Sequence, residues 1–408
     1  MNILVLTSVY PSEDDKNQDA TKVVRYFVQE WSKDGHRIIV IHNIHRYPSI
    51  IHKLPNSIKQ KMASKINFYI PDWKTVKEDK NFLDNNVEIW RLPILKLMPH
   101  KGHSKRIIKK QSNKIKAILE ARHFSPEIIM GHWMSPQLQI ISELRKIYLC
   151  KTSLVIHGRE YYIRDKKFNC IKYLTSIDAL GCRNNGDSEY VKRVLGLRKS
   201  PFICYSGIPD AFITNCIFDK GKFQELPKQW RIIYVGRLVA YKHVETTIRA
   251  LAQLDDYNFI FDIIGIGPEE KALKLLANKL GIGHKVIFHG KMSREQVFEY
   301  MHKAHCFVML SKGEAFGLVY LEAMASSCIV IASKGEGIDG IIKDKENCFL
   351  IPVGDKQGLI ICLEKLFNSQ PQELQYYSHN AFITASQFTD SNVAKRYLQD
   401  AMTFMEYI

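Results

Sequence analysis

The chain has 408 residues, of which 46% are hydrophobic and 25% are charged, and its formal net charge is +16. These proportions are typical of a soluble globular protein and exclude a disordered chain, while no apolar run approaches the roughly 18 residues that a membrane-spanning helix needs. The length exceeds what one hydrophobic core usually supports, so we expect two domains of about 200 residues each.

Short runs of β-branched residues alternate with longer amphipathic stretches along the chain. The chain opens with MNILVLTSVYPSEDD, which lacks the basic start of a secretory signal and predicts a buried strand. The predicted strands of the first half are Ile3–Ser8, Arg37–Asn43, Val87–Leu92, Glu127–Gly131, Thr152–His157, Ile177–Cys182 and Phe202–Tyr205. Those of the second half are Arg231–Val235, Asn258–Ile264, Lys285–His289, His305–Leu310, Cys328–Ala332 and Cys348–Ile351. The predicted helices include Ala20–Asp34, Val244–Leu254, Pro268–Leu280, Ser293–Lys303 and Leu318–Ser326.

This alternation predicts the α/β class. Continuous apolar strands separated by helices are typical of parallel sheets that are covered on both faces. Two such series in one chain indicate two doubly wound, Rossmann-like domains. In such sheets ligands bind beyond the carboxyl ends of the strands, so we expect the active site in the cleft between two facing domains.

The predicted boundaries follow from a polar, proline-containing stretch after SGIPDAF. We expect an N-terminal domain over residues 1–207 and a C-terminal domain over 208–385. Residues 386–408 predict a final helix that crosses back to the first domain. Residues 47–84 are basic and poorly periodic, and we interpret them as an insertion.

Nine cysteines occur along the chain, an odd number without a C-x-x-C pair or a zinc-like spacing with histidine. Most fall in or near apolar runs, where a thiol behaves as a small hydrophobic group. We therefore expect reduced, buried cysteines in a cytoplasmic protein.

The positive charge is confined to the first half. Residues 1–200 carry 36 Lys and Arg against 19 Asp and Glu, a net charge of +17, whereas residues 201–408 are almost neutral. Residues 96–116 alone hold eight basic residues and no acidic one. Such asymmetry indicates a polyanionic neighbour, either nucleic acid or an anionic membrane surface.

Charged residues of the second half follow predicted strands. Arg237 comes directly after one strand and Lys242 five residues later, a pattern that suits a phosphate or diphosphate but also an ordinary solvated surface. After another strand, Glu314 lies in a loop and Glu322 one turn into the next helix. Carboxylates can accept hydrogen bonds from sugar hydroxyls, although two acids at a helix start can also be simple dipole partners.

Two further features are weaker signals. The strand FDIIGIGPEEKAL ends in G-x-G without the third glycine of a dinucleotide fingerprint, and its glycines can serve a ligand or a tight turn. In the first half a predicted strand ends at His157, on the edge where ligands bind, although a lone histidine is often structural.

Read together, residues 231–355 resemble the nucleotide-sugar-binding domain of family 4 glycosyltransferases, which have the GT-B fold. The resemblance is carried in order by YVGRLVAYKHVETTIRAL, by FDIIGIGPEEKAL through KGEAFGLVYLEAMASS, and by IVIASKGEGIDGIIKDKENCFLIPVGD. The first half resembles the family more loosely, through its first strand, SKDGHRIIVI and VIHGRE. The resemblance implies an acceptor-binding first domain and a retaining hexosyltransferase of polysaccharide or glycolipid biosynthesis. Its substrate would be a UDP- or GDP-sugar, with no cofactor and no obligatory metal.

The resemblance also implies roles for individual residues. Arg237 and Lys242 would grip the donor diphosphate and stabilise the leaving group, and Glu322 would hold the ribose hydroxyls. Glu314 would lie at the transferred sugar, and His157 would approach the sugar or the β-phosphate from the first domain. The remaining donor-binding residues that it implies are Gly265, Lys291, Met292, Phe316, Gly317 and Leu318.

Some positions depart from the family pattern. The family often has a glycine-rich loop after its first strand, whereas residues 8–22 here contain no glycine. Ser327 and Cys348 stand where the family often has glycine. Donor contacts from the first domain are therefore less securely predicted than those from the second. A D-x-D pair for a metal is also absent from the sequence.

The basic segment leaves two interpretations open. Ile107, Ile108, Ile115, Ile118 and Leu119 fall close to one helical face, flanked by basic residues. The stripe can pack on its own domain, or the helix can rest on an anionic leaflet as in a peripheral enzyme on the inner face of the cytoplasmic membrane that extends a glycan or lipid-linked acceptor. The alternative function, a nucleic-acid-binding protein without transferase activity, lacks interleaved aromatic residues in this segment, so we expect no nucleic acid partner.

Overall fold

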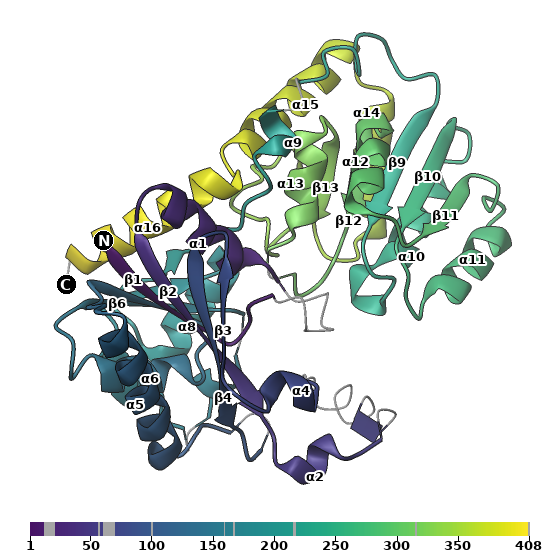
Figure 1. Ribbon diagram of the computed structural model, residues 1–408. Helices are drawn as coiled ribbons and strands as arrows, with labels where there is room; N and C mark the ends of the chain where they lie inside the picture. Colours follow the sequence, from purple (N-terminus) through teal and green to yellow (C-terminus); the bar gives the residue numbers. More distant parts are fainter. Residues whose placement is uncertain are drawn as a thin grey trace. The chain divides into compact units, whose positions relative to one another are not determined.

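The computed structural model divides the chain into two compact units (Figure 1). It describes residues 1–11, 21–55, 58–59, 70–98, 101–158, 160–165, 168–214, 218–314 and 316–406. Unit 1 comprises Met1–Arg183, Asp187–Cys204 and Val393–Ile408, and unit 2 comprises Asn184–Gly186 and Tyr205–Asn392. Most of the predicted glycine-free loop, residues 12–20, lies outside the described residues.

Unit 1 is built on an eight-stranded sheet in the order β3-β4-β2-β1-β5-β6-β7-β8. Its strands are β1 Asn2–Thr7, β2 Arg37–Arg46, β3 Lys80–Asp84, β4 Val87–Leu95, β5 Ile128–His132, β6 Lys151–Ile156, β7 Ala179–Cys182 and β8 Phe202–Ile203. All pairings are parallel except that of β3 with β4. Its helical segments are α1 Val23–Lys33, α2 Ser49–His52, α4 Trp73–Val76, α5 Lys105–Ala121, α6 Gln137–Leu144, η1 Tyr161–Ile163, α7 Ile171–Leu174 and α8 Asn185–Leu195, the last of which begins in unit 2, together with most of α16 Asp390–Glu406.

Helices cover both faces of the unit 1 sheet. Leu4 and Leu6 of β1 belong to a core cluster with the apolar faces of α5 and α6. On α1, Trp31 donates its indole N–H to the carbonyl of Ala394 in α16 (2.8 Å), and Tyr397 packs against Trp31 with ring centroids 5.4 Å apart. The last helix is therefore part of the unit 1 core.

Unit 2 contains a six-stranded, wholly parallel sheet in the order β11-β10-β9-β12-β13-β14. Its strands are β9 Trp230–Val235, β10 Phe259–Ile264, β11 Val286–Gly290, β12 Cys306–Met309, β13 Ile329–Ser333 and β14 Phe349–Ile351. Its helical segments are α9 Ala211–Thr214, η2 Ala240–Lys242, α10 Val244–Leu251, α11 Glu270–Lys279, α12 Arg294–Lys303, α13 Leu318–Ala325, α14 Lys356–Phe367 and α15 Pro371–Ser386.

The strand order places a topological switch point in each sheet. In unit 2 the chain moves outward from β9 through β10 and β11, then returns to the other side of β9 with β12. In unit 1 the corresponding reversal lies between β1 and β5. Loops at the carboxyl ends of the two strands beside a switch point diverge, which leaves room for a ligand there.

The observed elements confirm the predicted fold class and every predicted strand to within a few residues. The antiparallel hairpin strand β3 was not predicted, and it lies within the stretch that we interpreted as an insertion. The longer helices α6, α8, α14 and α15 were also not among the predicted ones. Among the described residues no helix is long and apolar enough to span a membrane, and the eight described cysteines are free thiols.

The apolar stripe of the basic helix α5 packs on its own domain. Ile108, Ile115 and Leu119 are buried in the unit 1 core, and Ile107 and Ile118 pack against it. The stripe is therefore not available to enter a bilayer, which corrects that part of the membrane hypothesis. The basic side chains that remain exposed to solvent on this helix include Lys105, Arg106, Lys109 and Lys110. Pro99 and His100, in the same basic segment, lie outside the described residues.

Candidate active site

The unit 2 switch point lies between the loops that follow β9 and β12. Arg237 is the second residue after β9 and is exposed, and Lys242 ends the short helix η2. The phenolic O–H of Tyr234 donates to the backbone carbonyl of Arg237 (2.9 Å), which fixes the start of this loop. Both predicted cations thus follow the central strand of the sheet.

Lys242 and Glu314 form an ion pair across the switch point. The Lys242 ammonium donates to Glu314 Oε2, and the two side chains are only 14% and 17% exposed. The backbone N–H of Glu314 donates to the carboxylate of Glu336 (2.8 Å). The structure therefore brings together two predicted site residues that are far apart in the sequence, and it adds Glu336 to them.

Gly317 begins α13 in the left-handed conformation, with φ at 81°. A Cβ at this position would lie 2.5 Å from the Tyr320 ring, so the turn requires glycine. Phe316 is buried, while Leu318 is the first helical residue. The first backbone N–H groups of α13 have no partner within the helix, and such groups are suited to bind an anion.

Glu322, one turn into α13, forms an ion pair with Arg294 at the start of α12. Arg294 Nη2 lies 2.6 Å from Glu322 Oε1, and the guanidinium also lies over the Phe212 ring, 4.9 Å from its centroid. The carboxylate is largely buried, with 15% of its side chain exposed. Arg294 therefore holds Glu322 in a fixed orientation.

The two glycines of the G-x-G turn serve backbone packing. A Cβ on Gly265 would lie 1.8 Å from the carbonyl oxygen of Gly236, and one on Gly267 would lie 2.1 Å from that of Leu238. The loops after β9 and β10 also share backbone hydrogen bonds, from Leu238 N–H to Ile266 and from Glu269 N–H to Leu238 (both 3.1 Å). The glycines thus let one loop support the loop that carries Arg237.

The remaining predicted donor residues follow β11. Lys291 is exposed and Met292 is half-buried, and both precede α12. Ser293 and Gln296 form a capping box that begins α12. The structure thus places these two residues at the carboxyl edge of the same sheet, beside β10, and Gly265 N–H donates to Gly290 at that edge (2.8 Å).

His157, the predicted residue of unit 1, follows β6 and lies among aromatic and acidic side chains. Its ring stacks on Trp133 with centroids 3.9 Å apart and an interplanar angle of 15°. Its Nε2 lies 3.1 Å from His132 Nδ1. The Glu160 carboxylate accepts the backbone N–H groups of His157 (3.1 Å) and Met134 (2.9 Å), and burial raises the pKa of Glu160 to about 7.

Several residues of these clusters were not predicted. Glu160 stands three residues after His157 in HGRE, and Glu336 stands in KGEGIDG, so both lay within segments that carried the resemblance. The only sequence signal for Arg294 was its position in the first turn of a predicted helix. His132 and Trp133 follow a predicted strand, and that position was the signal that could have found them.

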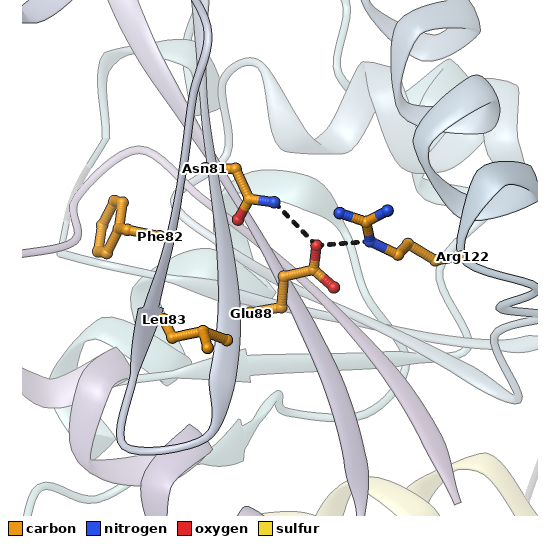
Figure 2. Close-up of a pocket in the computed structure, with 5 residues that line it drawn as sticks. All are labelled: Asn81, Phe82, Leu83, Glu88 and Arg122. Carbon is orange, nitrogen blue, oxygen red and sulfur yellow. Dashed lines mark hydrogen bonds and ion pairs between the residues drawn. The ribbon is translucent and has the colours of Figure 1, made fainter.

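Shallow hollows also lie away from these clusters. One, of about 420 Å³, lies at the β3–β4 edge of unit 1 and is lined by Asn81, Phe82, Leu83, Glu88 and Arg122 (Figure 2). There the Asn81 amide and the Arg122 guanidinium both donate to Glu88 Oε1, at 3.0 and 2.8 Å (Figure 2). Across the described ranges no group of three or more His, Cys, Asp or Glu side chains could hold a metal ion.

Comparison with known proteins agrees with this architecture. Residues 217–382 match the family model described as glycosyl transferases group 1. The chain is 26% identical over 231 residues to the lipopolysaccharide core biosynthesis glycosyltransferase LpsE of Rhizobium meliloti, covering 56% of this chain and 65% of LpsE. It is also 26% identical over 317 residues to an uncharacterized glycosyltransferase of Methanocaldococcus jannaschii, covering 76% of this chain and 82% of that protein.

The fold is shared with solved structures at lower identity. A glycosyltransferase from Rickettsia africae superposes with a TM-score of 0.68 at 15% identity, covering 99% of this chain and 98% of that one. The chain therefore has the GT-B fold and is related to glycosyltransferases of the bacterial biosynthesis type. The comparisons do not favour the alternative of a nucleic-acid-binding protein.

Proposed function

We propose that this protein transfers a sugar from a nucleoside-diphosphate sugar to a glycan or lipid-linked acceptor, with retention of the anomeric configuration. The observation that carries the proposal is the Lys242–Glu314 ion pair, which joins the two loops beside the unit 2 switch point. Ligands of doubly wound sheets bind at this point. Around it lie a second cation, Arg237, and the start of α13, which suit a bound diphosphate.

The proposed chemistry needs positive charge at the leaving group. Cleavage of the bond between the anomeric carbon and the diphosphate oxygen leaves the electron pair on that oxygen, while the sugar becomes oxocarbenium-like. Lys242, Arg237 and the N–H groups that begin α13 supply this positive charge. The acceptor hydroxyl then forms the new bond on the face that the diphosphate leaves, and its proton passes to the departing phosphate oxygen. We assign neither Glu314 nor His157 to nucleophilic attack.

The carboxylates of unit 2 are proposed to recognise the donor's hydroxyl groups. Glu322 is held through Oε1 by Arg294, so Oε2 is oriented to accept from the ribose hydroxyls. Glu314 is held through Oε2 by Lys242, so Oε1 is oriented toward the transferred sugar. Each carboxylate is thus fixed before the donor binds, which reduces the entropy that binding costs.

A panel of UDP- and GDP-sugars tests the proposal. We expect at least one of them to raise the melting temperature and to be consumed slowly, with release of the nucleoside diphosphate, and faster with an acceptor. The product's anomeric configuration, read by NMR, should match that of the donor. Failure of every nucleotide sugar to bind or turn over, with the protein folded, would overturn the proposed function.

The exposed cations of α5 support a peripheral location on the cytoplasmic face of the membrane. Lys105, Arg106, Lys109 and Lys110 are exposed, as are the apolar side chains of Leu97 and Met98 just before the helix. Each basic residue near an anionic leaflet contributes about 1 kcal/mol to adsorption. We therefore propose electrostatic adsorption through unit 1, without insertion of the helix.

Co-sedimentation with lipid vesicles tests this location. Binding to vesicles that contain phosphatidylserine should fall with added salt and fall further when the four cations of α5 are changed to Gln. The matched control changes four exposed lysines of unit 2 to Gln, namely Lys220, Lys271, Lys279 and Lys303. Equal loss in both quadruple variants, or equal binding to neutral vesicles, would contradict a specific docking surface.

A further inference from the structure

Three side chains of unit 1 form a line of hydrogen bonds that ends at His157. The phenolic oxygen of Tyr397, in α16, lies 3.3 Å from Nε2 of His132, and Nδ1 of His132 lies 3.1 Å from Nε2 of His157. Tyr397 and His132 are 1% and 0% exposed, so the link between them is made away from water, whereas the link to His157 is partly buried. The residues come from a helix and two strand ends that are remote in the sequence.

The direction of these hydrogen bonds follows from the chemistry of the groups. Burial lowers the pKa of His132 to about 3 and that of His157 below its ordinary value, and the charge of Arg183 acts in the same direction. Both rings are therefore neutral at physiological pH, and each carries one N–H and one acceptor nitrogen. Burial also raises the pKa of the Tyr397 phenol, which keeps its proton.

A phenol and a neutral imidazole pair best with the phenol as donor, because the imidazole nitrogen is by far the stronger base. If Tyr397 donates to His132 Nε2, the proton of His132 must be on Nδ1. That N–H then donates to His157 Nε2, and the proton of His157 must be on Nδ1. One phenolic group in α16 can thus decide which nitrogen of His157 is a donor.

We propose that Tyr397 and His132 are positioning residues that hold His157 as the Nδ1–H tautomer, so that it donates a hydrogen bond to an oxygen of the donor sugar or its phosphate. The proposal rests on the proposed function, which supplies a sugar nucleotide as the ligand. The ligand oxygen can belong to a hydroxyl or to a phosphate, since either accepts this bond. The last helix of the chain then contributes to the site as well as to the fold.

The surroundings of His157 favour one fixed ring orientation. Trp133 stacks on the ring and has a positive φ of 66°, a backbone conformation that costs energy for an aromatic residue. Glu160 accepts the N–H groups of Met134 and His157, and so ties the loops after β5 and β6 together. These contacts hold the ring plane, while the line from Tyr397 sets the proton.

The line of hydrogen bonds from Tyr397 through His132 to His157 is called the relay below. Tyr397→Phe tests it, because this variant removes the hydroxyl and keeps the ring that packs on Phe27 and Trp31. Nitrogen-15 NMR of histidine-labelled protein reports which nitrogen of His157 carries the proton, without any ligand. We expect Nδ1–H in the wild type and a mixture of tautomers in Tyr397→Phe. Tyr148→Phe, whose hydroxyl lies outside this line of hydrogen bonds, is the matched control and should leave the tautomer unchanged.

Kinetics with the donor provides the second readout. Tyr397→Phe should lower kcat/KM about five- to tenfold, the worth of one neutral hydrogen bond. His132→Asn keeps an N–H donor near the position of Nδ1, so it should retain more activity than His132→Leu. A purely structural role for His132 predicts instead that the loss follows the melting temperature of the two variants.

The outcomes are distinguishable. His157 protonated on Nε2 in the wild type, or the same tautomer in wild type and Tyr397→Phe, would overturn the relay. If the NMR result is as expected but no nucleotide sugar is turned over, the relay stands and the proposed function fails. If donors are turned over but Tyr397→Phe changes neither tautomer nor kcat/KM, the proposed function stands and the relay fails.

Discussion

Lys242 and Glu314 are 72 residues apart in the sequence, yet their side chains form an ion pair at the carboxyl edge of the unit 2 sheet. One follows β9 and the other follows β12, the two neighbouring strands at which the chain reverses direction in the sheet. The pair therefore joins the loops between which a ligand is expected. Its two members also orient each other before any donor arrives.

This pair predicts coupled effects on turnover. Lys242→Met should lower kcat/KM for the donor well over tenfold, because it removes a charge-assisted contact worth about 1.5–3 kcal/mol and leaves Glu314 without its cation. Glu314→Gln should also lower kcat/KM. The double variant should lose much less than the two single losses combined, because the residues act as a unit.

Lys279→Met is the matched control, since Lys279 is an exposed lysine at the end of α11 in the same unit. It should leave kcat/KM at the wild-type value. Strictly additive losses for Lys242 and Glu314, measured as donor consumption, would show that the ion pair has no part in catalysis.

Glu322 and Arg294 predict a graded effect on donor affinity. Glu322→Ala should weaken donor binding well over tenfold, since it removes the proposed ribose contact and leaves Arg294 without this partner. Arg294→Met should weaken binding less, because the carboxylate remains but loses its fixed orientation. Calorimetric titration with the nucleoside diphosphate alone measures both effects. A larger loss for Arg294→Met than for Glu322→Ala would contradict the assignment of Glu322 as the ribose contact.

Leaving-group stabilisation by side chains predicts insensitivity to chelators. Lys242, Arg237 and the start of α13 provide the positive charge that many transferases take from a divalent cation. Donor consumption should therefore be unchanged in excess EDTA, whereas Arg237→Ala should reduce it more than tenfold. Loss of activity with EDTA that Mg²⁺ or Mn²⁺ restores would show that a metal supplies this charge.

The sequence predicted those features that depend on local pattern. Apolar β-branched runs predicted the parallel strands, because strands buried on both faces leave a continuous apolar signal. The positions of Lys242, Glu314 and Glu322 after those strands were enough to place them on one edge of a sheet. The antiparallel strand β3 was missed because its residues, KNFLD, are exposed or half-buried and have no such signal.

Contacts between remote residues could not be predicted in the same way. The pairing of Glu322 with Arg294 depends on how α12 and α13 pack, and the position of Tyr397 beside His132 depends on how α16 packs on unit 1. The stripe of α5 shows the same limit, because one amphipathic pattern fits both a domain core and a membrane surface. The packing of Ile108 and Ile115 in the core was needed to show that the apolar face of α5 belongs to the domain and not to a membrane surface.

The packing of the G-x-G turn predicts a loss of stability in Gly267→Ala. The added Cβ would lie 2.1 Å from the carbonyl oxygen of Leu238, and backbone atoms cannot rotate away as a flexible side chain can. The shift should cost about 1–3 kcal/mol, as overpacking of a close-packed site does. Urea denaturation measures it, and Gly221→Ala is the control, since its nearest neighbour is the Asp219 side chain at 3.2 Å. Equal stability of the two variants would contradict this account of the glycine.

Glu160 predicts a specific dependence of stability on pH. Burial raises the pKa of this carboxyl from 4.5 to about 7 in the folded protein, while the N–H groups of Met134 and His157 oppose the rise. Because the folded pKa is the higher one, folding favours the protonated form. The contribution to stability is therefore full below pH 4.5 and is lost as the pH rises to about 7, with a total of at most about 3 kcal/mol.

Glu160→Gln tests this dependence, because glutamine keeps a carbonyl oxygen for the two N–H groups and cannot ionise. The free energy of unfolding of the wild type, relative to this variant, should fall between pH 4.5 and pH 7 and stay constant above that range. Glu120→Gln, at an exposed carboxylate of α5, is the control and should run parallel to the wild type through the same range. Denaturation curves at half-unit pH steps measure all three proteins. If the free energy of unfolding of the wild type runs parallel to that of Glu160→Gln, folding does not raise the pKa of Glu160, because its two backbone hydrogen bonds offset its burial.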